Sequence, residues 1–321
     1  MIKTFFRLIF LFFIILWAND SFAQKTLIYS DPYKSYKTAQ ELFDKEKYSS
    51  AQYYFKEVIN KFDNPQDEIR INAEYYFAVC ALKLYHRNVE TILTRFALDH
   101  PDHPKSKYIY FQLGKHYYQT KKFKKSIEFF EKVDQYDLSM SDQNEYLFKL
   151  GYSKFMKKNL AESKVLFNEL LQRKTDYEIP TTYYYSHIAY SEGKYQTALE
   201  GFRKISSNKM FKPIIPYYIT QILYQQSKYD ELISYAPSYM DSITEKRKGE
   251  FAKLIADSYF KKKNFKTSLN YYKTFKKFAK SSRESNYQVA FCYYKTKDLR
   301  KAIELFSRVA YKEDSLSQIC Y

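Results

Sequence analysis

The chain has few of the residues that interrupt or cross-link a fold. Its 321 residues include 5 glycines, 8 prolines, 3 cysteines and a single tryptophan. So few glycines argue against glycine-punctuated β folds and against a phosphate-binding glycine loop. The thinly spread prolines leave long windows in which a helix can continue without a break. The composition therefore favours an all-helical chain and disfavours a nucleotide site of the P-loop type.

The cysteines predict neither a disulfide framework nor a metal-ligand motif. Their number is odd, and Cys80 and Cys292 lie in the apolar runs AVCAL and AFCYY. A free cysteine packs as a small hydrophobe. We interpret these two residues as buried, inert thiols.

Recognisable catalytic motifs are also missing. The sequence contains no HExxH, no GxSxG and no Walker loop. The run DHPDHP, residues 99–104, could bring two histidines to one ion, but no further ligands lie nearby in sequence. We therefore predict a protein that is not an enzyme, with no catalytic residues, no cofactor and no metal. Catalysis in a part of the protein beyond Tyr321 is the alternative.

Only one long apolar run is present, and it lies at the N-terminus. MIKTFFR carries two basic residues, LIFLFFIILWA follows, and SFA ends at Ala23. This is the layout of a secretory signal peptide, and the run is shorter than the roughly 20 residues that span a bilayer. An uncleaved anchor is the alternative interpretation. We predict a signal peptide at residues 1–23 and an exported mature chain from Gln24, without a transmembrane span, in the periplasm or associated with the outer membrane.

Acidic residues are outnumbered by basic ones. There are 53 Lys and Arg against 36 Asp and Glu, which gives a formal net charge of +17. Such a surface favours acidic partners such as nucleic acid, an anionic membrane or an acidic protein face. Export argues against nucleic acid, so we predict no nucleic-acid partner.

What the chain does contain is 36 Tyr and 27 Phe, distributed with a period. Two positions, twelve residues apart, recur every 34 to 39 residues and mostly hold small side chains. The first position holds Ala39, Ala78, Gly114, Gly151, Ser186, Thr220, Ala256 and Ala290. The second holds Ala51, Glu90, Ser126, Ser163, Ala198, Leu232, Ser268 and Ala302. This period indicates stacked pairs of antiparallel helices that approach closely where neither presents bulk.

A large residue often follows the second small position by four residues. These residues are Phe55, Phe130, Phe167, Phe202, Tyr272 and Phe306. Two units depart from the pattern, with Glu90 in the second and Leu232 in the sixth. Pro237 lies within the second helix expected in the sixth unit, so we predict a kink or an early helix end at Ala236.

The pattern resembles the tetratricopeptide repeat (TPR) family. The third unit matches its motif at Tyr117, Phe123, Ser126, Phe130 and Val133, and the eighth at Tyr293, Leu299, Ala302, Phe306 and Val309. The resemblance implies an all-α, right-handed superhelical solenoid of antiparallel helix pairs over residues 24–316. Its eight repeats are 32–65, 71–104, 107–140, 144–177, 179–212, 213–246, 249–282 and 283–316. Residues 317–321 would start a ninth, and we expect the chain to be the N-terminal piece of a longer protein.

In the TPR family the first helix of each pair lines the concave face. The resemblance therefore implies a partner-binding groove formed by Phe111, Lys115, Tyr118, Phe148, Tyr152, Phe155, Tyr183, His187, Tyr190, Tyr217, Tyr224, Tyr287 and Tyr294. Aromatic surface supplies much of the binding energy at protein interfaces. Packing between repeats is the alternative interpretation of the same rings.

The functional hypothesis is a non-catalytic protein–protein interaction scaffold in the bacterial envelope, whose partners are other envelope proteins. The Lys-rich runs YQTKKFKKS, MKKNL, FKKKNF and FKKFAKSS support an alternative. They form either a solvated edge or a docking surface for an anionic glycan or lipid of the envelope. The scaffold part of a longer enzyme, or of a secretion or motility component, is the third hypothesis.

Overall fold

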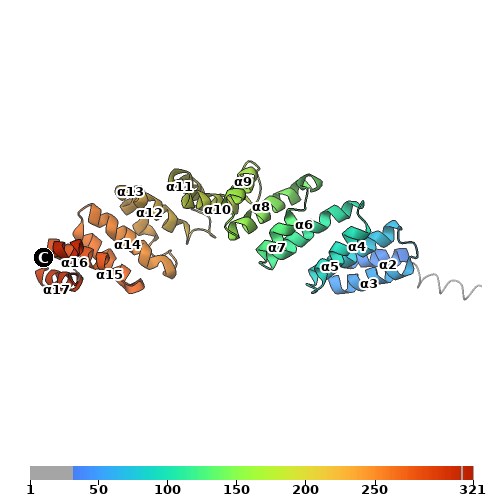
Figure 1. The fold of residues 1–321 in the computed structure, drawn as a ribbon, viewed down its shortest axis with the longest axis horizontal. Helices are drawn as coiled ribbons and strands as arrows, with labels where there is room; N and C mark the ends of the chain where they lie inside the picture. Colours follow the sequence, from blue (N-terminus) through green and yellow to red (C-terminus); the bar gives the residue numbers. More distant parts are fainter. Residues whose placement is uncertain (1–31, 312–313, 321) are drawn as a thin grey trace, which may run out of the picture. The chain divides into compact units, whose positions relative to one another are not determined.

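The computed structural model describes residues 32–311 and 314–320, and the predicted signal peptide lies outside them. All regular secondary structure in these residues is helical (Figure 1). The α-helices are α2 (Pro32–Asp44), α3 (Tyr48–Lys61), α4 (Glu68–Lys83), α5 (Val89–Asp99), α6 (Pro104–Gln119), α7 (Phe123–Phe130), α8 (Met140–Met156), α9 (Leu160–Leu171), α10 (Glu178–Ser191), α11 (Tyr195–Lys204), α12 (Ile215–Gln225), α13 (Tyr229–Tyr235), α14 (Glu245–Lys261), α15 (Phe265–Phe278), α16 (Arg283–Lys295), α17 (Leu299–Val309) and α18 (Ser315–Cys320). Two 3₁₀ helices, η1 (Gln135–Asp137) and η2 (Ala236–Tyr239), complete the set.

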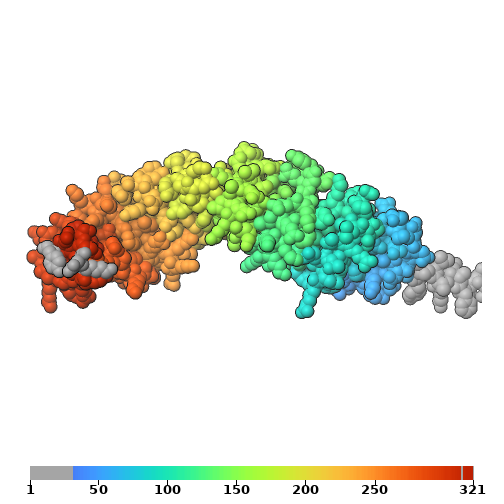
Figure 2. Space-filling view, in the orientation of Figure 1, coloured from blue at the N-terminus to red at the C-terminus, as the bar shows by residue number. Residues whose placement is uncertain are grey.

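The described residues form two compact units, which divide between Lys157 and Lys158. In the first unit α2 packs on α3, α4 on α5, and α6 on α7, and α8 follows. In the second unit α10 packs on α11, α12 on α13, α14 on α15, and α16 on α17. The space-filling view shows the side chains of neighbouring helix pairs closing against one another within each unit (Figure 2). The predicted all-α solenoid of helix pairs is confirmed. No helix in the described part of the chain is long and apolar enough to cross a bilayer.

The small residues lie where the paired helices meet. All eight residues at the first small position are buried. A methyl group at Gly114 would lie 2.5 Å from Cδ1 of Phe130, so the glycine makes room for the ring on the partner helix. Ser126 on α7 donates its hydroxyl hydrogen to the Gly114 carbonyl at 3.0 Å. Ser268 repeats this bond to the Ala256 carbonyl at 2.8 Å. A serine at the second small position therefore leaves room for the close approach of the two helices and stabilises it with a hydrogen bond.

The turn inside each helix pair uses a left-handed residue. Backbone φ is positive at Glu46, Tyr85, Lys121, Lys158, Gly193, Ser227, Lys263 and Lys297. After α6, the Lys121 amide donates to the Tyr118 carbonyl and the Lys122 amide to the Tyr117 carbonyl. This is the Schellman arrangement, in which two orphan carbonyls at the helix end are satisfied. The left-handed position normally favours glycine, and among these eight turns only the one at residue 193 has a glycine there.

The two departing units behave differently from the rest. In the second unit α5 begins at Val89, four residues after Tyr85, whereas the other second helices begin two residues after their left-handed residue. Glu90 consequently does not enter the small position, and its carboxylate accepts hydrogen bonds from Tyr117 and Lys125. In the sixth unit α13 ends at Tyr235 and η2 continues it, which confirms the early helix end predicted beside Pro237.

Several first helices extend beyond the expected repeat bounds. α4, α6, α8 and α14 each begin three or four residues before the repeat start inferred from the motif. Capping residues set these starts. Asp67 accepts amide hydrogens of α4, and Ser139 accepts one of α8. The motif register locates the helix pairs, and local caps decide where each helix begins.

Candidate protein-binding site

One hollow of the first unit lies between α2, α4 and α6. Its volume is about 480 Å³. Five aromatic rings line it, from Phe43, Tyr48, Tyr75, Tyr76 and Tyr85. Val79 and Leu82 on α4 add an apolar floor. Ligand sites are typically concave, mostly apolar and of this size, with a few polar groups that fix orientation.

The polar groups of this hollow are cationic or neutral. Lys83, Lys105 and Lys115 line it together with His116, Gln112 and Gln119, and no carboxylate is among the lining residues. Burial lowers the pKa of His116, and the charge of Lys122 adds to this effect, so the imidazole is neutral at pH 7. The hollow therefore presents three ammonium groups among aromatic rings.

Lys105 carries one of these charges in a partly buried position. Its Nζ donates to Asn72 Oδ1 at 2.5 Å and lies 4.9 Å from the Tyr75 ring centroid and 4.3 Å from that of Tyr76. Partial burial lowers the pKa of this ammonium. The two ring faces stabilise the cation only in part. A carboxylate placed in the hollow would add the missing anionic partner.

Lys115 is already engaged at one side. Its Nζ donates to Glu145 Oε2 at 2.6 Å and lies 4.8 Å from the Phe111 ring centroid. Hydrogen bonds from Lys115 and Lys149 oppose the burial of Glu145 and hold its pKa below the ordinary range. Lys83 lies 5.8 Å from the Tyr48 ring and is exposed at the rim. Among the described residues, Lys83 and Lys105 are the lining lysines that form no ion pair with a carboxylate.

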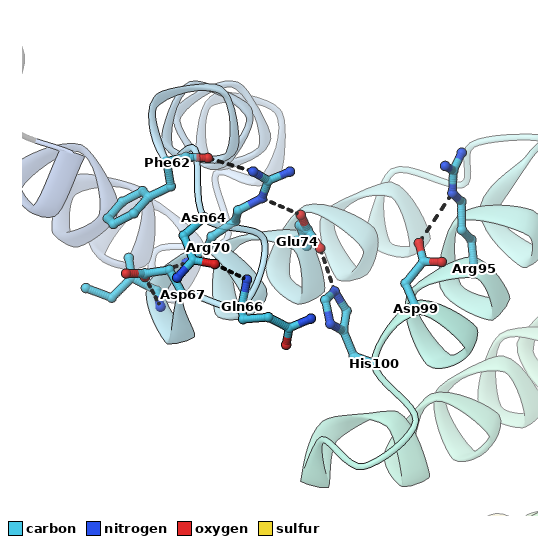
Figure 3. A network of polar contacts seen from close by, with 10 residues as sticks. Phe62, Asn64, Gln66, Asp67, Arg70, Glu74, Arg95, Asp99 and His100 are labelled. Atoms are coloured by element: carbon cyan, nitrogen blue, oxygen red, sulfur yellow. Dashed lines mark hydrogen bonds and ion pairs between the residues drawn. The ribbon is translucent and has the colours of Figure 1, made fainter.

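A network of polar contacts positions α4, which carries Tyr75 and Tyr76 (Figure 3). Arg70 Nη1 donates to the Phe62 carbonyl at 2.6 Å, and Arg70 Nε to Glu74 Oε1 at 3.1 Å. Glu74 Oε2 in turn lies 2.7 Å from Nε2 of His100, at the end of α5. The chain of contacts links the end of α3, the middle of α4 and the end of α5. It fixes the rotation of α4 and so directs the rings next to Glu74.

The predicted groove rings fall into two sets along the first helices. Three of the five rings of the first set, Phe111, Phe148, Tyr183, Tyr217 and Tyr287, are buried in packing. Phe111 is 0% exposed, and Phe148 and Tyr217 are buried. Tyr183 is half-buried, with its ring 4.4 Å from that of Phe211, and Tyr287 is also half-buried. The expectation of groove surface is wrong for Phe111, because a side chain without exposed area offers no contact to a partner.

The second set of rings keeps more of its surface. Tyr118, Phe155, Tyr190 and Tyr224 are half-buried, and Tyr294 is 49% exposed. Tyr152 and His187 are also half-buried, with the Tyr152 ring 5.5 Å from that of Tyr118. Tyr190 donates to Gln221 Oε1 at 2.8 Å. Partner binding by these residues stays a prediction.

Only Lys115 of the predicted groove residues lines the hollow. The prediction missed Tyr75, Val79, Leu82 and Lys83, all on α4. These stand 36 residues before Phe111, Lys115, Tyr118 and Gln119, which is the spacing between the second and third repeats. The repeat register therefore carried the signal, although the motif of the second unit is weak.

Both histidines of the run at residues 99–104 make contacts within the fold. His100 contacts Glu74, and Nδ1 of His103 accepts the Lys105 amide hydrogen at the start of α6. Among the described residues no group of three or more His, Cys, Asp or Glu side chains could hold a metal ion. Cys80 and Cys292 are free and buried, and burial raises their thiol pKa values to about 12 and about 11. Such thiols are inert.

Solved structures with a similar fold include several repeat proteins. A tetratricopeptide repeat protein from Parabacteroides merdae is 10% identical, with 81% of this chain and 98% of that chain covered and a TM-score of 0.46. PilF of Pseudomonas aeruginosa is 15% identical, with 66% and 95% covered and a TM-score of 0.47. MamA MSR-1 C2 is 14% identical, with 54% and 97% covered and a TM-score of 0.46. At these identities and scores we carry no property of those proteins over to this chain.

The family comparison concerns one repeat. No curated protein matches the sequence at a significant level. Residues 284–313 match the tetratricopeptide repeat family model, and this segment spans most of α16 and all of α17. The chain thus carries a tetratricopeptide repeat at residues 284–313, preceded by helix pairs in the same small-residue register.

Proposed function

We propose that the protein is a non-catalytic scaffold that binds an acidic segment of another protein in the hollow between α2, α4 and α6. The observation that carries the proposal is the lining of this hollow, which combines five aromatic rings with three lysines and no carboxylate. Helical repeat folds commonly serve protein–protein interaction, and this supports the general class.

The chemistry of the hollow supports this partner class. Rigid aromatic side chains provide large contact area at a low cost in conformational entropy, and they dominate binding at interfaces. The lysines attract and orient a segment of opposite charge. An acidic segment with one or two apolar side chains would use both properties.

The N-terminal sequence supports a place of action outside the cytoplasm. The basic start, the apolar run and the small residue at Ala23 support export. We therefore propose that the partner is another protein of the bacterial envelope.

The test uses the full chain and a library of random twelve-residue peptides displayed on phage. We expect enriched peptides to contain Asp or Glu. A double variant, Lys83→Gln with Tyr85→Asn, should bind them at least about tenfold more weakly, because it removes one charge and one ring of the rim. Asparagine tolerates the left-handed backbone of Tyr85, so the turn is preserved.

The matched control is Lys107→Gln with Tyr136→Asn, which removes the same groups elsewhere in the first unit. Tyr136 is 82% exposed and does not line the hollow. We expect this control to bind as the unchanged protein does. Enrichment of basic peptides, or equal losses in both variants, would contradict the proposed site.

A further inference from the structure

One segment of the second unit combines many cations with no carboxylate. Residues 264–283 contain five lysines and one arginine, and neither Asp nor Glu. The segment comprises α15 with its flanking residues. Lys266, Lys273, Lys276, Lys277 and Lys280 are all exposed. This helix surface therefore carries positive charge with no carboxylate of its own.

The lysines of α15 form one stripe. At 3.6 residues per turn, Lys266, Lys273, Lys276 and Lys277 fall on the same face of the helix. Lys280 follows just beyond the end of α15 and extends the basic segment. The buried residues Ser268 and Phe275 lie on the opposite side of α15, whereas the buried Leu269 and Tyr272 adjoin Lys273 and Lys276. The stripe is therefore a solvent-facing row of charges about 16 Å long, counted at the helical rise of about 1.5 Å per residue.

These lysines differ from others in their partners. Within the described residues, no ion pair joins any of the five to a carboxylate, whereas Lys164, Lys204 and Lys262 of the same unit each have one. Burial lowers the pKa of Lys276, and the nearby charge of Arg308 lowers it further. Like charges held together without counter-charges cost free energy, which an external anion relieves.

A second hollow lies beside the stripe. It has a volume of about 260 Å³ and is lined by residues of α15, α16 and α17. Lys273 and Lys276 border it on one side and Lys301 on the other, while Val289 and Leu305 supply apolar surface. Its acidic residue, Glu304, accepts from Arg308 at 2.7 Å, and Lys301 donates to Asp298 at 2.8 Å. The two α15 lysines are thus the unpaired cations at this hollow.

We infer that this lysine stripe is a docking surface for an anionic phospholipid bilayer. A row of charges spaced along a helix matches many phosphate groups in a plane better than the few carboxylates of a short peptide. Tyr272 and Phe275 are buried, and the exposed ring of Phe278 lies about 100° around the helix from Lys277, so the stripe itself contains no aromatic ring on which nucleic-acid bases could stack. The surface lies in the second unit and is separate from the acidic-peptide site proposed for the first.

The experiment measures sedimentation of the full chain with two kinds of vesicle at about 50 mM salt, where charge attraction is weakly screened. One kind is phosphatidylcholine alone, and the other contains phosphatidylglycerol and phosphatidylcholine at about 1:3. The readout is the difference in bound protein between the anionic and the neutral vesicles. Binding through the apolar N-terminal run is common to both vesicle types and is removed by this subtraction. We expect Lys273→Gln, Lys276→Gln and Lys277→Gln together to reduce this increment at least about tenfold.

The matched control removes equal charge from lysines that already have carboxylate partners. It is the triple variant Lys194→Gln, Lys204→Gln and Lys262→Gln, in the same unit. We expect it to retain the anionic increment within about threefold, since those charges are locally compensated. Equal losses in both variants, equal binding to both vesicle types, or stronger competition by short DNA or polyglutamate than by the lipid would overturn the inference.

Discussion

At the scale of single residues, the turn positions show how the chain manages with so few glycines. Lys121, Lys158, Lys263 and Lys297 occupy left-handed backbone positions, where most side chains crowd the following carbonyl. Lysine satisfies no special geometric need there, but it is exposed and keeps the turn soluble. The Lys-rich runs YQTKKFKKS, MKKNL and FKKKNF therefore contain turns inside helix pairs, whereas FKKFAKSS covers the end of α15 and the link to α16.

Glycine at these positions should stabilise the protein. We expect each of Lys121→Gly, Lys263→Gly and Lys297→Gly to raise the free energy of unfolding by about 0.5–1 kcal/mol, because glycine adopts positive φ without steric cost. Urea unfolding followed by circular dichroism measures this. Lys56→Gly, at an exposed position inside α3, is the control and should lower stability by about 1 kcal/mol. A loss of stability at the turn sites would show that the lysine side chains contribute to the turn.

The small positions are a second residue-scale feature, and they depend on contact. Gly201 packs against Ser186 on the partner helix α10, just as Gly114 packs against Phe130. At Gly114 and Gly201 the close approach of two helices leaves no room even for a methyl group, whereas the sixth unit accommodates the buried Thr220 and Leu232. Phe306, by contrast, is only half-buried, whereas Phe130 and Phe167 are fully buried.

At the scale of helices, caps decide where each element starts. His103 is the N-cap of α6, and its Nδ1 accepts the Lys105 amide hydrogen at 3.2 Å. The bond requires an unprotonated nitrogen. Burial, followed by the charges of Lys105 and His100, lowers the pKa of His103 below its ordinary value. His103 can therefore not be protonated at Nδ1 and accept the capping hydrogen bond at the same time.

This arrangement predicts a pH dependence with a definite sign. The unfolded chain protonates His103 near pH 6.5, whereas the folded chain resists protonation until a lower pH. Between these two values the unfolded state binds more protons, so stability falls as the pH is lowered through this window. His103→Asn keeps a neutral cap at every pH.

We expect His103→Asn to match the unchanged protein at pH 7.5 and to exceed its unfolding free energy by about 0.5 kcal/mol at pH 5.5. Urea titrations at both pH values make the comparison. His86→Asn is the control, because His86 lies outside any cap contact of α6 and should leave the pH profile unchanged. Parallel profiles for His103→Asn and the unchanged protein would argue against the cap.

At the scale of the whole molecule, the structure consists of two compact helical units, each with its own buried clusters. Residues 71–129 contribute one cluster in the first unit, and residues 189–255 another in the second. Each helix pair packs mainly on its neighbours in sequence, as expected of a repeat array. Local contacts of this kind let each unit form its core from adjacent repeats.

Export is the prediction that concerns the whole chain. We expect the protein isolated from its native cells to lack residues 1–23 and to begin at Gln24, because the basic, apolar and small-residue segments follow the order that signal peptidase requires. Intact-mass measurement of the purified protein decides it. A mass that includes residues 1–23 would favour the uncleaved anchor instead.

The sequence by itself determined the helix pairs and their register. Small residues twelve apart, recurring at a fixed period, have few structural solutions, because only close antiparallel helices need them at that spacing. Pro237 likewise shortened its helix for a reason internal to the backbone. Such constraints depend on residues close together in the sequence, so they can be deduced from the sequence alone.

Only the tertiary structure decided which rings are surface and which are core. Phe111 and Tyr118 lie on one helix and look alike in sequence, yet Phe111 is fully buried and Tyr118 is not. The difference arises from the neighbours of each ring, such as the approach of Phe111 to Phe130 on the paired helix α7. The hollow lined by Tyr75, Tyr76 and Lys105 depends in the same way on how α2, α4 and α6 stack. Burial is a property of the packed neighbours of a side chain, and a repeat motif specifies those neighbours only in outline.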